Sequence, residues 1–302
     1  MRASMELEWP DGPRLTGSTV PDRPAAAYVL SGLIVGLMVV AAVAGLFVDG
    51  LYPDGAWARE ALRGGDLATL VLTVPLLLGA LILSARGSRR AQVVWVAMLG
   101  YSIYNYAYYV FGSEFNDVFL LHIAILSMSI FALALLAPRL DVAGIAARIR
   151  GGAAAKWVGA FLVLVGLGQG GLWAFLIVRF ALTGELLAEI PEDGQHLVFA
   201  LDLALLAPTL VLAGILLFRR TAVGLVMGAA VSLFGAAYQV NLALAGAFQD
   251  AANVPGVKAF PLEGIVLLLG FVIASAVLLA RRPTEEIARS ATSGAGSGNR
   301  CS

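Results

Sequence analysis

The chain has 302 residues, of which 60% are hydrophobic and only 13% are charged, and its mean hydropathy is +0.87. These values lie far outside the usual range of soluble domains and indicate an integral membrane protein. The single cysteine, Cys301, excludes an internal disulfide framework and a dithiol redox centre. The formal net charge of zero is uninformative as a total, because the distribution of charge along the chain carries the information.

Two polar tails flank the apolar part of the chain. Residues 1–25 carry four acids, and the apolar run that follows is too long for a signal peptide, so we expect a cytoplasmic N-terminal tail. Residues 283–302 are rich in Ser and Gly and predict a disordered cytoplasmic C-terminal tail. Residues 26–282 between them form the predicted transmembrane domain.

Eight apolar segments follow one another in this domain. Each has about 20 residues or more, which is the length that a helix needs to cross a hydrocarbon core of roughly 30 Å. Backbone polar groups in lipid must be satisfied within each segment, so we expect an all-α, polytopic helical bundle. The predicted segments are 26–49, 67–85, 92–112, 117–137, 157–183, 198–218, 222–247 and 262–281.

The connections between these segments alternate in charge. Basic residues gather in every second connection, as at Arg86 and Lys156, whereas acids such as Asp54 and Glu185 dominate the others. The positive-inside rule therefore predicts an even number of spans with both termini in the cytoplasm. The connection at 138–156 could form a short amphipathic helix against lipid headgroups or remain a plain loop.

The second and sixth segments hint at an internal repeat. The second begins at Asp66-Leu67-Ala68, contains Pro75 and ends before an arginine-rich turn. The sixth contains Asp202-Leu203-Ala204 and Pro208 and ends at a double arginine. Two four-helix halves related by an axis along the membrane normal would explain this similarity. Chance similarity between Leu- and Ala-rich helices is the alternative.

Three GxxxG pairs predict sites of close helix packing, within the bundle or between protomers. They are Gly32/Gly36, Gly166/Gly170 and Gly224/Gly228.

Polar residues on the third segment form the first candidate site. Tyr101, Tyr104, Asn105 and Tyr108 have the spacing of one helix face, and such a face could line a solute path or hold a polar ligand. The alternative for the outer tyrosines is an aromatic belt at the membrane surface. For Tyr101 and Tyr104, which lie deeper, the alternative is a structural role.

Two ionisable residues lie inside predicted spans. His122 could take part in a proton relay or form a hydrogen bond to a neighbouring helix. A membrane haem needs two facing histidines, and His196 lies in an outer loop, so no haem is expected; nor do zinc or nucleotide motifs appear. Asp202 is an intramembrane carboxylate, and Arg179 is its predicted ion-pair partner, in a functional or a purely structural role.

These polar residues share a location near the outer ends of their segments. Scattered hydrogen bonds between helices would not favour one leaflet, so we expect a polar cavity that is open to the outside and closed toward the cytoplasm by apolar packing. Its predicted residues are Tyr101, Tyr104, Asn105, His122, Asp202, Gln239, Asn241 and Glu263.

The runs YNYAYYVFGSEFNDVFLLHIA and DLALLAPTLVLAGILLFRR resemble an uncharacterised family of multi-pass bacterial membrane proteins. The resemblance covers most of the membrane region. It implies this architecture and a bacterial plasma-membrane location, and it brings no activity or site residues.

Three functional classes remain. The first is a transporter or binding protein for a small polar solute. The second is an intramembrane enzyme for a lipid or lipid-linked substrate, with His122 and either Asp117 or Asp202 as acid–base groups. The third is a non-catalytic subunit or sensor. The lipid bilayer is the expected partner, with a homo-oligomer or a partner membrane subunit as further options; no nucleic acid, cofactor or metal is expected.

Overall fold

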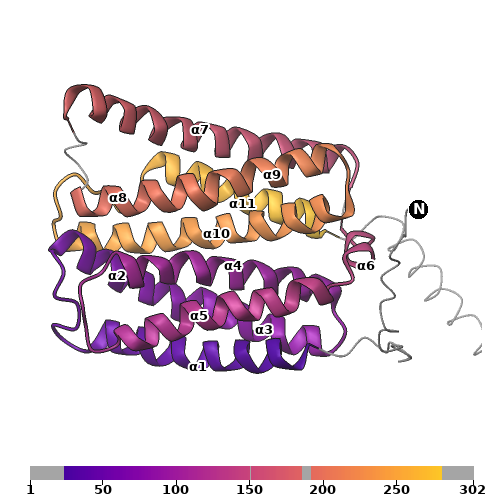
Figure 1. Cartoon of the computed structure of the whole chain (residues 1–302), viewed down its shortest axis with the longest axis horizontal. Coiled ribbons are helices and arrows are strands. Elements are labelled where there is room, and N and C mark those ends of the chain that lie inside the picture. Colours follow the sequence, from indigo (N-terminus) through magenta and orange to yellow (C-terminus); the bar gives the residue numbers. More distant parts are fainter. Residues whose placement is uncertain (1–23, 150, 186–191, 281–302) are drawn as a thin grey trace, which may run out of the picture.

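The structure is a computed structural model that describes residues 24–149, 151–185 and 192–280, and only the backbone of residues 192–195 (Figure 1). These residues form helices and turns, and no strand occurs among them. Both predicted tails lie almost entirely outside the described residues, so the predictions of their disorder and cytoplasmic location are not tested.

The first half of the chain forms a bundle of four long helices, the second of which is interrupted by a π-helical segment. Its elements are α1 (Ala25–Phe47), α2 (Ala56–Ala68), the π-helix η1 (Thr69–Thr73), α3 (Val74–Ala85), α4 (Arg89–Phe111) and α5 (Phe119–Leu136). α1 and α4 each pack against both α3 and α5. The four helices therefore close into a ring.

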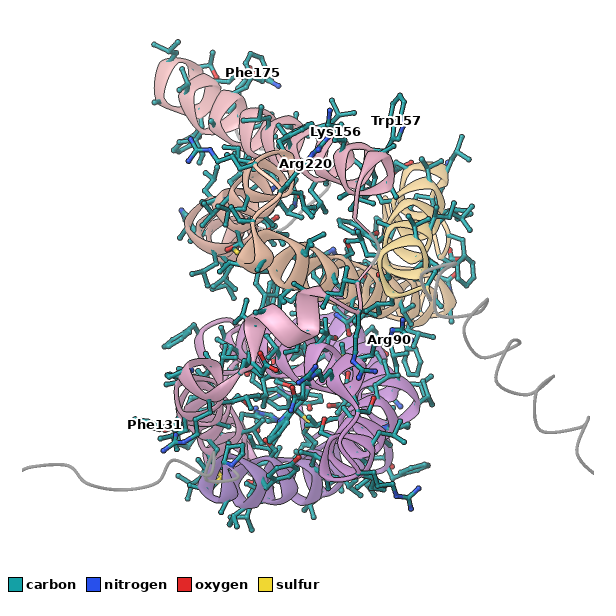
Figure 2. The ribbon with its side chains drawn as sticks, turned by 90° about the vertical axis from the view of Figure 1, so that its right-hand side faces the viewer. Arg90, Phe131, Lys156, Trp157, Phe175 and Arg220 are labelled. Atoms are coloured by element: carbon teal, nitrogen blue, oxygen red, sulfur yellow. The ribbon has the colours of Figure 1, made fainter. Side chains whose placement is uncertain are left out.

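The second half repeats this order of elements after a short connection that contains the 3₁₀ turn η2 (Ala137–Arg139) and α6 (Val142–Ala146). It consists of α7 (Ala153–Thr183), α8 (Glu192–Leu201), the π-helix η3 (Asp202–Leu206), α9 (Ala207–Phe218), α10 (Ala222–Ala251) and α11 (Leu262–Leu279). An end-on view shows the two halves as two groups of helices, one above the other (Figure 2). Arg90, Lys156 and Arg220 lie at the end that faces the viewer, which we name the basic end.

Seven of the long helices in the described part of the chain are long and apolar enough to cross a membrane. The chain is therefore an integral, multi-pass membrane protein. The eighth long helix, α4, has 23 residues but carries the tyrosines and Asn105. It packs against α3, α5 and α10, so its polar side chains face protein more than lipid. A span enclosed in this way can be less apolar than its neighbours.

The two halves share a break at the same place in their second helix. Each has a five-residue π-helix followed by a 12-residue α-helix whose second residue is a proline, Pro75 or Pro208. Proline has no N–H and clashes with the carbonyl of the preceding turn, and a π turn relieves that clash. The N–H of Val74 accordingly donates to Thr69, and that of Ala207 to Asp202, each five residues back.

The repeat continues into the next helix of each half. Ser88 caps α4 by accepting a hydrogen bond from the Ala91 N–H, and Thr221 caps α10 by accepting one from the Gly224 N–H. The two prolines and the π segments place Thr69, not Asp66, at the position equivalent to Asp202. The match of the two Asp-Leu-Ala triplets in the sequence is therefore three residues out of register.

Helix boundaries differ from the predictions mainly at the start of two broken helices. The second span begins at Ala56 instead of 67, because the charges of α2 are satisfied by protein: Glu60 pairs with Arg59 and Arg63. The sixth span begins at Glu192 instead of 198.

The two halves meet along α10, which packs against α2 and α4 of the first half. At the basic end, α6 lies across this junction and contacts both α4 and α10. Ile145 and Ile149 are buried there. Of the two alternatives for this connection, a short helix is thus present, and its apolar residues lie against the protein instead of the membrane.

Two of the three GxxxG pairs lie in close helix contacts. A Cβ at Gly166 would lie 2.9 Å from Cγ2 of Val211 and 3.0 Å from the carbonyl oxygen of Ala207, so α7 and α9 approach closely at this glycine. Gly224 and Gly228 pack in the same way against Leu216 and Leu217 of α9. Gly32 and Gly36 on α1 meet no atom within 4 Å.

The contact at Gly166 gives a test of the packing in the second half. Gly166→Val should force α7 away from α9 and lower the free energy of unfolding by about 1–3 kcal/mol, as overpacking does. Thermal unfolding of the detergent-solubilised protein measures the loss. Gly168→Val is the matched control, because it adds the same β-branched side chain to α7 where no atom lies within 4 Å. Equal losses in both variants would contradict this packing.

Candidate functional site

A cavity of about 880 Å³ opens between the two halves at the end opposite the basic end. Residues of α2, α4, α8 and α10 line it, together with loop residues at that end. Three of the predicted cavity residues are among its lining: Tyr104, Asn105 and Asn241. The predicted face of α4 therefore does border an open space, with Tyr108 as a further member.

Two amides that line the cavity have hydrogen-bonding atoms without a partner among the described residues. Asn105 is 5% exposed, and its Nδ2 donor is unpaired. The Oδ1 acceptor of Asn241 is buried and unpaired as well. Buried polar atoms are normally satisfied, and an unsatisfied one costs about 1–3 kcal/mol. Asn105 and Asn241 therefore each keep one unpaired hydrogen-bonding atom in the wall of the cavity.

Asp202 forms the centre of a hydrogen-bond network beneath this cavity. It is 1% exposed and accepts hydrogen bonds from the Tyr104 hydroxyl, from Gln169 Nε2 at 2.6 Å and from Trp173 Nε1 at 2.8 Å. Tyr104 lies on α4 in the first half, whereas Gln169 and Trp173 lie on α7 in the second. The carboxyl group thus joins the two halves directly below the cavity.

Aromatic rings surround the Tyr104 hydroxyl. Its oxygen lies 3.4 Å from the Tyr238 hydroxyl of α10, and the two rings meet edge to face at 5.1 Å. Phe234 contacts the rings of both Tyr104 and Tyr101. Tyr101 is therefore part of the aromatic layer next to Tyr104, but it does not line the cavity itself.

Apolar packing fills the junction between this layer and the basic end. The buried residues here come from α4 and α10 and include Met98, Leu99, Val226, Ala229 and Ala230. Together with α6 they fill the junction on that side.

A second buried carboxyl group lies inside the first half. Asp66 accepts hydrogen bonds from the hydroxyls of Tyr52 at 2.8 Å and Tyr109 at 3.1 Å. Gly45 of α1 makes room for it, since a Cβ there would overlap the carboxyl group. Burial and the nearby Asp66 raise the pKa of Tyr52 above its ordinary value, so this phenol stays protonated and donates. The sequence alone does not indicate this group, because the charges of residues 54–66 are typical of a loop outside the membrane.

His122 belongs to this second group and not to the cavity. It is 0% exposed, and its imidazole lies 4.7 Å from the Tyr109 ring and 5.9 Å from the Tyr106 ring, measured between centroids. Neither ring nitrogen has a hydrogen-bond partner among the described residues. The predicted cavity therefore divides into an open site between the halves and a buried polar group within the first, and Tyr109 borders both.

The remaining predicted residues do not line the cavity. Gln239 is buried on the side of α10 that faces Gly264 of α11, and Glu263 is exposed in the first turn of α11. The predicted ion pair between Arg179 and Asp202 is wrong. Arg179 pairs with Glu185 at 2.7 Å near the end of α7, and the carboxyl oxygens of Asp202 are already held by neutral donors.

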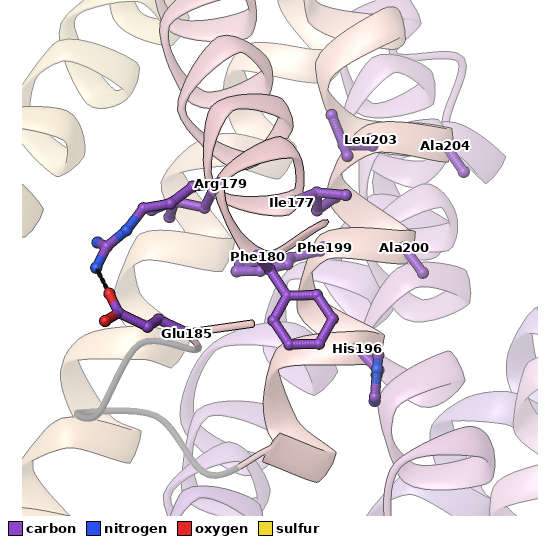
Figure 3. Close-up of a pocket in the computed structure, with 10 residues that line it drawn as sticks. Ile177, Arg179, Phe180, Glu185, His196, Phe199, Ala200, Leu203 and Ala204 are labelled. Atoms are coloured by element: carbon purple, nitrogen blue, oxygen red, sulfur yellow. Dashed lines mark hydrogen bonds and ion pairs between the residues drawn. The ribbon is translucent and has the colours of Figure 1, made fainter. Parts of the chain in front are cut away.

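An apolar groove adjoins the cavity between α7 and α8 (Figure 3). Its volume is about 660 Å³, and its lining includes Ile177, Phe180 and Phe199. The Arg179–Glu185 pair lies at its edge. His196 lines both the groove and the cavity, so the two spaces are neighbours.

No group of three or more His, Cys, Asp or Glu side chains within the described ranges could hold a metal ion. His122 and His196 lie in different places, the first closed in the bundle and the second at the groove, so these two residues do not form a haem site.

No family model, curated protein or solved structure matches this chain.

The Asp202 network can be tested by removing one donor. Tyr104→Phe should leave a buried carboxyl oxygen without its donor and lower the free energy of unfolding by about 1–3 kcal/mol. Tyr108→Phe is the control: it removes the same group from the same helix, and the Tyr108 hydroxyl makes no hydrogen bond to the described residues. Denaturant titration of the purified protein compares the two. Equal stability of both variants and the parent chain would show that the bond contributes nothing.

Proposed function

We propose that this protein binds a small polar solute in the cavity between its two halves and carries it across the membrane. The observation that supports this most directly is the pair of unpaired amide atoms on Asn105 and Asn241 beside an open space. Ligand sites commonly combine a concave space with a few polar groups that fix the orientation of the ligand. Transporters built from repeats bind their substrates between the repeats.

The position of the helix breaks supports a carrier. Gly65, four residues before η1 begins at Thr69, lines the cavity. The other π-helix, η3, starts at Asp202, which accepts a hydrogen bond from the cavity residue Tyr104. Interrupted helices next to a binding site are typical of secondary transporters, and π turns often occur at functional sites. Movement of one half against the other along α10 would close this side of the cavity and open the basic end.

We further propose that the cavity faces the outside of a bacterial cell. The basic end then lies in the cytoplasm, in agreement with the positive-inside rule. The alternative of an enzyme with His122 as acid or base receives less support. The ring neighbours of His122 are tyrosines, and Asp202 is engaged by Tyr104, Gln169 and Trp173.

One observation favours a second candidate, a protein that handles an amphiphilic molecule. The apolar groove between α7 and α8 borders the polar cavity at His196. A molecule with a polar head and an apolar tail could place one part in each space.

The solute site predicts a loss of binding when Asn105 is changed. Purified protein in nanodiscs is equilibrated with a defined mixture of amino acids, sugars and amines, and the retained solutes are identified by mass spectrometry. Asn105→Leu should reduce retention about tenfold or more, since one lost hydrogen bond and an altered lining cost roughly 1.4 kcal/mol. Ser129→Ala, a buried change on α5 away from the cavity, is the control. Equal retention by both variants would contradict the proposal.

Access to the cavity gives an independent test. In a Cys301→Ser background, Asn241→Cys should react with a membrane-impermeant maleimide added outside intact cells. Ser129→Cys should stay unlabelled, because this position is fully buried in the first half. A solute that binds in the cavity should slow the labelling of Asn241→Cys. Labelling only after the inner face is exposed would overturn the proposed orientation.

A further inference from the structure

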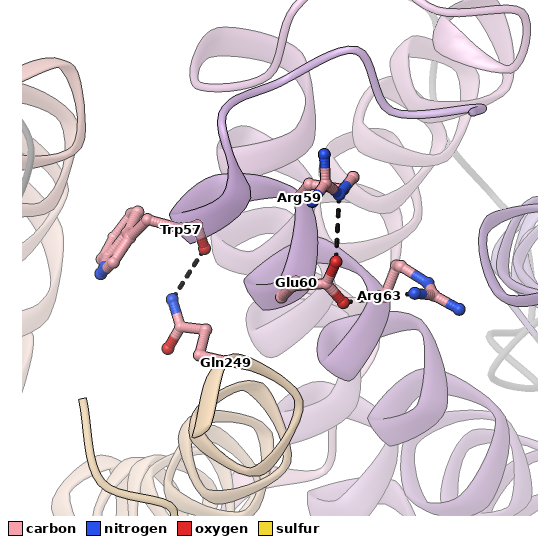
Figure 4. A network of polar contacts seen from close by, with 5 residues as sticks. All are labelled: Trp57, Arg59, Glu60, Arg63 and Gln249. Carbon is pink, nitrogen blue, oxygen red and sulfur yellow. Dashed lines mark hydrogen bonds and ion pairs between the residues drawn. The ribbon is translucent and has the colours of Figure 1, made fainter. Parts of the chain in front are cut away.

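The charged side chains that line the cavity are acidic. Asp54 and Glu114 are among the lining residues, and no Lys or Arg is, for the part of the chain that the structure describes. The nearby basic residues of α2 are engaged elsewhere (Figure 4). Arg59 donates to Glu60 at 3.0 Å, and Arg63 donates to the same carboxylate at 3.2 Å. The cavity therefore has a negative lining with no basic side chain in contact with it.

Asp54 has an unused carboxyl oxygen although it is buried. The residue is 5% exposed, and its Oδ1 accepts a hydrogen bond from the Glu114 N–H at 2.9 Å. Its Oδ2 has no partner within the described ranges. A buried carboxylate oxygen without a partner is costly, and a cation in the cavity would compensate for it.

Aromatic side chains make up much of the remaining lining. Tyr104, Tyr108, Tyr109 and Tyr238 line the cavity, and Trp57 and Phe111 lie at the same opening. The faces of aromatic rings attract cations, and aromatic cages bind quaternary ammonium groups. The Trp57 carbonyl accepts a hydrogen bond from Gln249 Nε2 at 2.7 Å, which ties this part of α2 to α10 (Figure 4).

The floor of the cavity adds no positive charge. Tyr104 donates its hydroxyl to Asp202, whose other donors, Gln169 and Trp173, are neutral. Asp202 forms no ion pair with any described residue, because Arg179 pairs with Glu185 instead. A cationic ligand above Tyr104 would therefore find no competing cation among the described residues behind this tyrosine.

From this lining we infer that the solute is a small organic cation, an amine or a quaternary ammonium compound. Asp54 provides the counter-charge, the tyrosine rings provide the walls, and Asn105 and Asn241 hold the polar part of the molecule. This inference rests on the proposed function and names the substrate class of the same site. The shared chemistry is an ammonium group, which a free small cation or a lipid headgroup can supply.

The test compares choline with 3,3-dimethylbutan-1-ol, a neutral molecule of the same shape. Isothermal titration of the full chain in nanodiscs should give choline at least about tenfold higher affinity than the neutral alcohol. Asp54→Asn should lower the choline affinity about tenfold or more and leave that of the alcohol unchanged. Asp117→Asn, an exposed change at the same end of the molecule, is the matched control and should change neither affinity.

A second variant keeps the test decisive if Asp54→Asn fails to fold. Tyr108→Leu removes one aromatic wall of the cavity, whereas Tyr108→Phe keeps the ring. Choline affinity should fall about threefold or more in the first variant and stay near that of the parent chain in the second. Equal losses in both would show that the ring face does not hold the cation.

The outcomes separate this inference from the proposed function. Binding of neutral solutes that depends on Asn105, without binding of choline, overturns the cationic substrate and leaves the solute site standing. If no small solute of either kind binds, both fail. Hexyltrimethylammonium distinguishes the two sources of the ammonium group: an affinity more than about a hundredfold above that of choline indicates a lipid headgroup with its tail in the groove. Similar affinities indicate a free small cation.

Discussion

A buried hydrogen bond from Tyr104 to Asp202 links the two halves inside the bundle, next to the packing of α10 against α2 and α4. A carboxyl group inside a membrane protein has no water to satisfy it, so the protein must supply the donors. Here they come from both halves: Tyr104 from α4, and Gln169 and Trp173 from α7. Tyr104, one of these donors, also lines the cavity. The same tyrosine therefore contributes both to the contact between the halves and to the site between them.

The repeated helix break explains where this carboxyl group lies. In each half a proline follows a five-residue π-helix, and Asp202 is the first residue of the π segment in the second half. The equivalent position in the first half is Thr69, and the buried carboxyl group there, Asp66, lies one turn earlier and bonds to Tyr52 and Tyr109. The two halves thus share a backbone plan but use their acids differently. Asp66 accepts its hydrogen bonds inside the first bundle, whereas Asp202 accepts one across the interface between the halves.

This asymmetry bears on the proposed function. The acid at the interface lies under an open cavity that also has unpaired amides and a partly unpaired Asp54. The acid inside the first half lies in a closed group with His122. A solute that enters the cavity therefore lies beside side chains with unpaired polar atoms, whereas Asp66 already accepts two hydrogen bonds. The proposed organic cation would supply the positive charge that no Lys or Arg among the described lining residues gives to Asp54.

The sequence by itself determined the helical class, the approximate spans and the face of α4 that carries Tyr104 and Asn105, because these follow from the length and periodicity of single segments. It could not determine the partners of Asp202. Charge alone favoured Arg179, but the real donors are neutral side chains whose positions depend on how α4 and α7 pack. The separation of His122 from the cavity and the position of Asp54 at its edge were likewise decided only by tertiary structure. The physical reason is that hydrogen bonds between helices depend on relative rotation and depth, which the hydrophobic pattern of one helix does not contain.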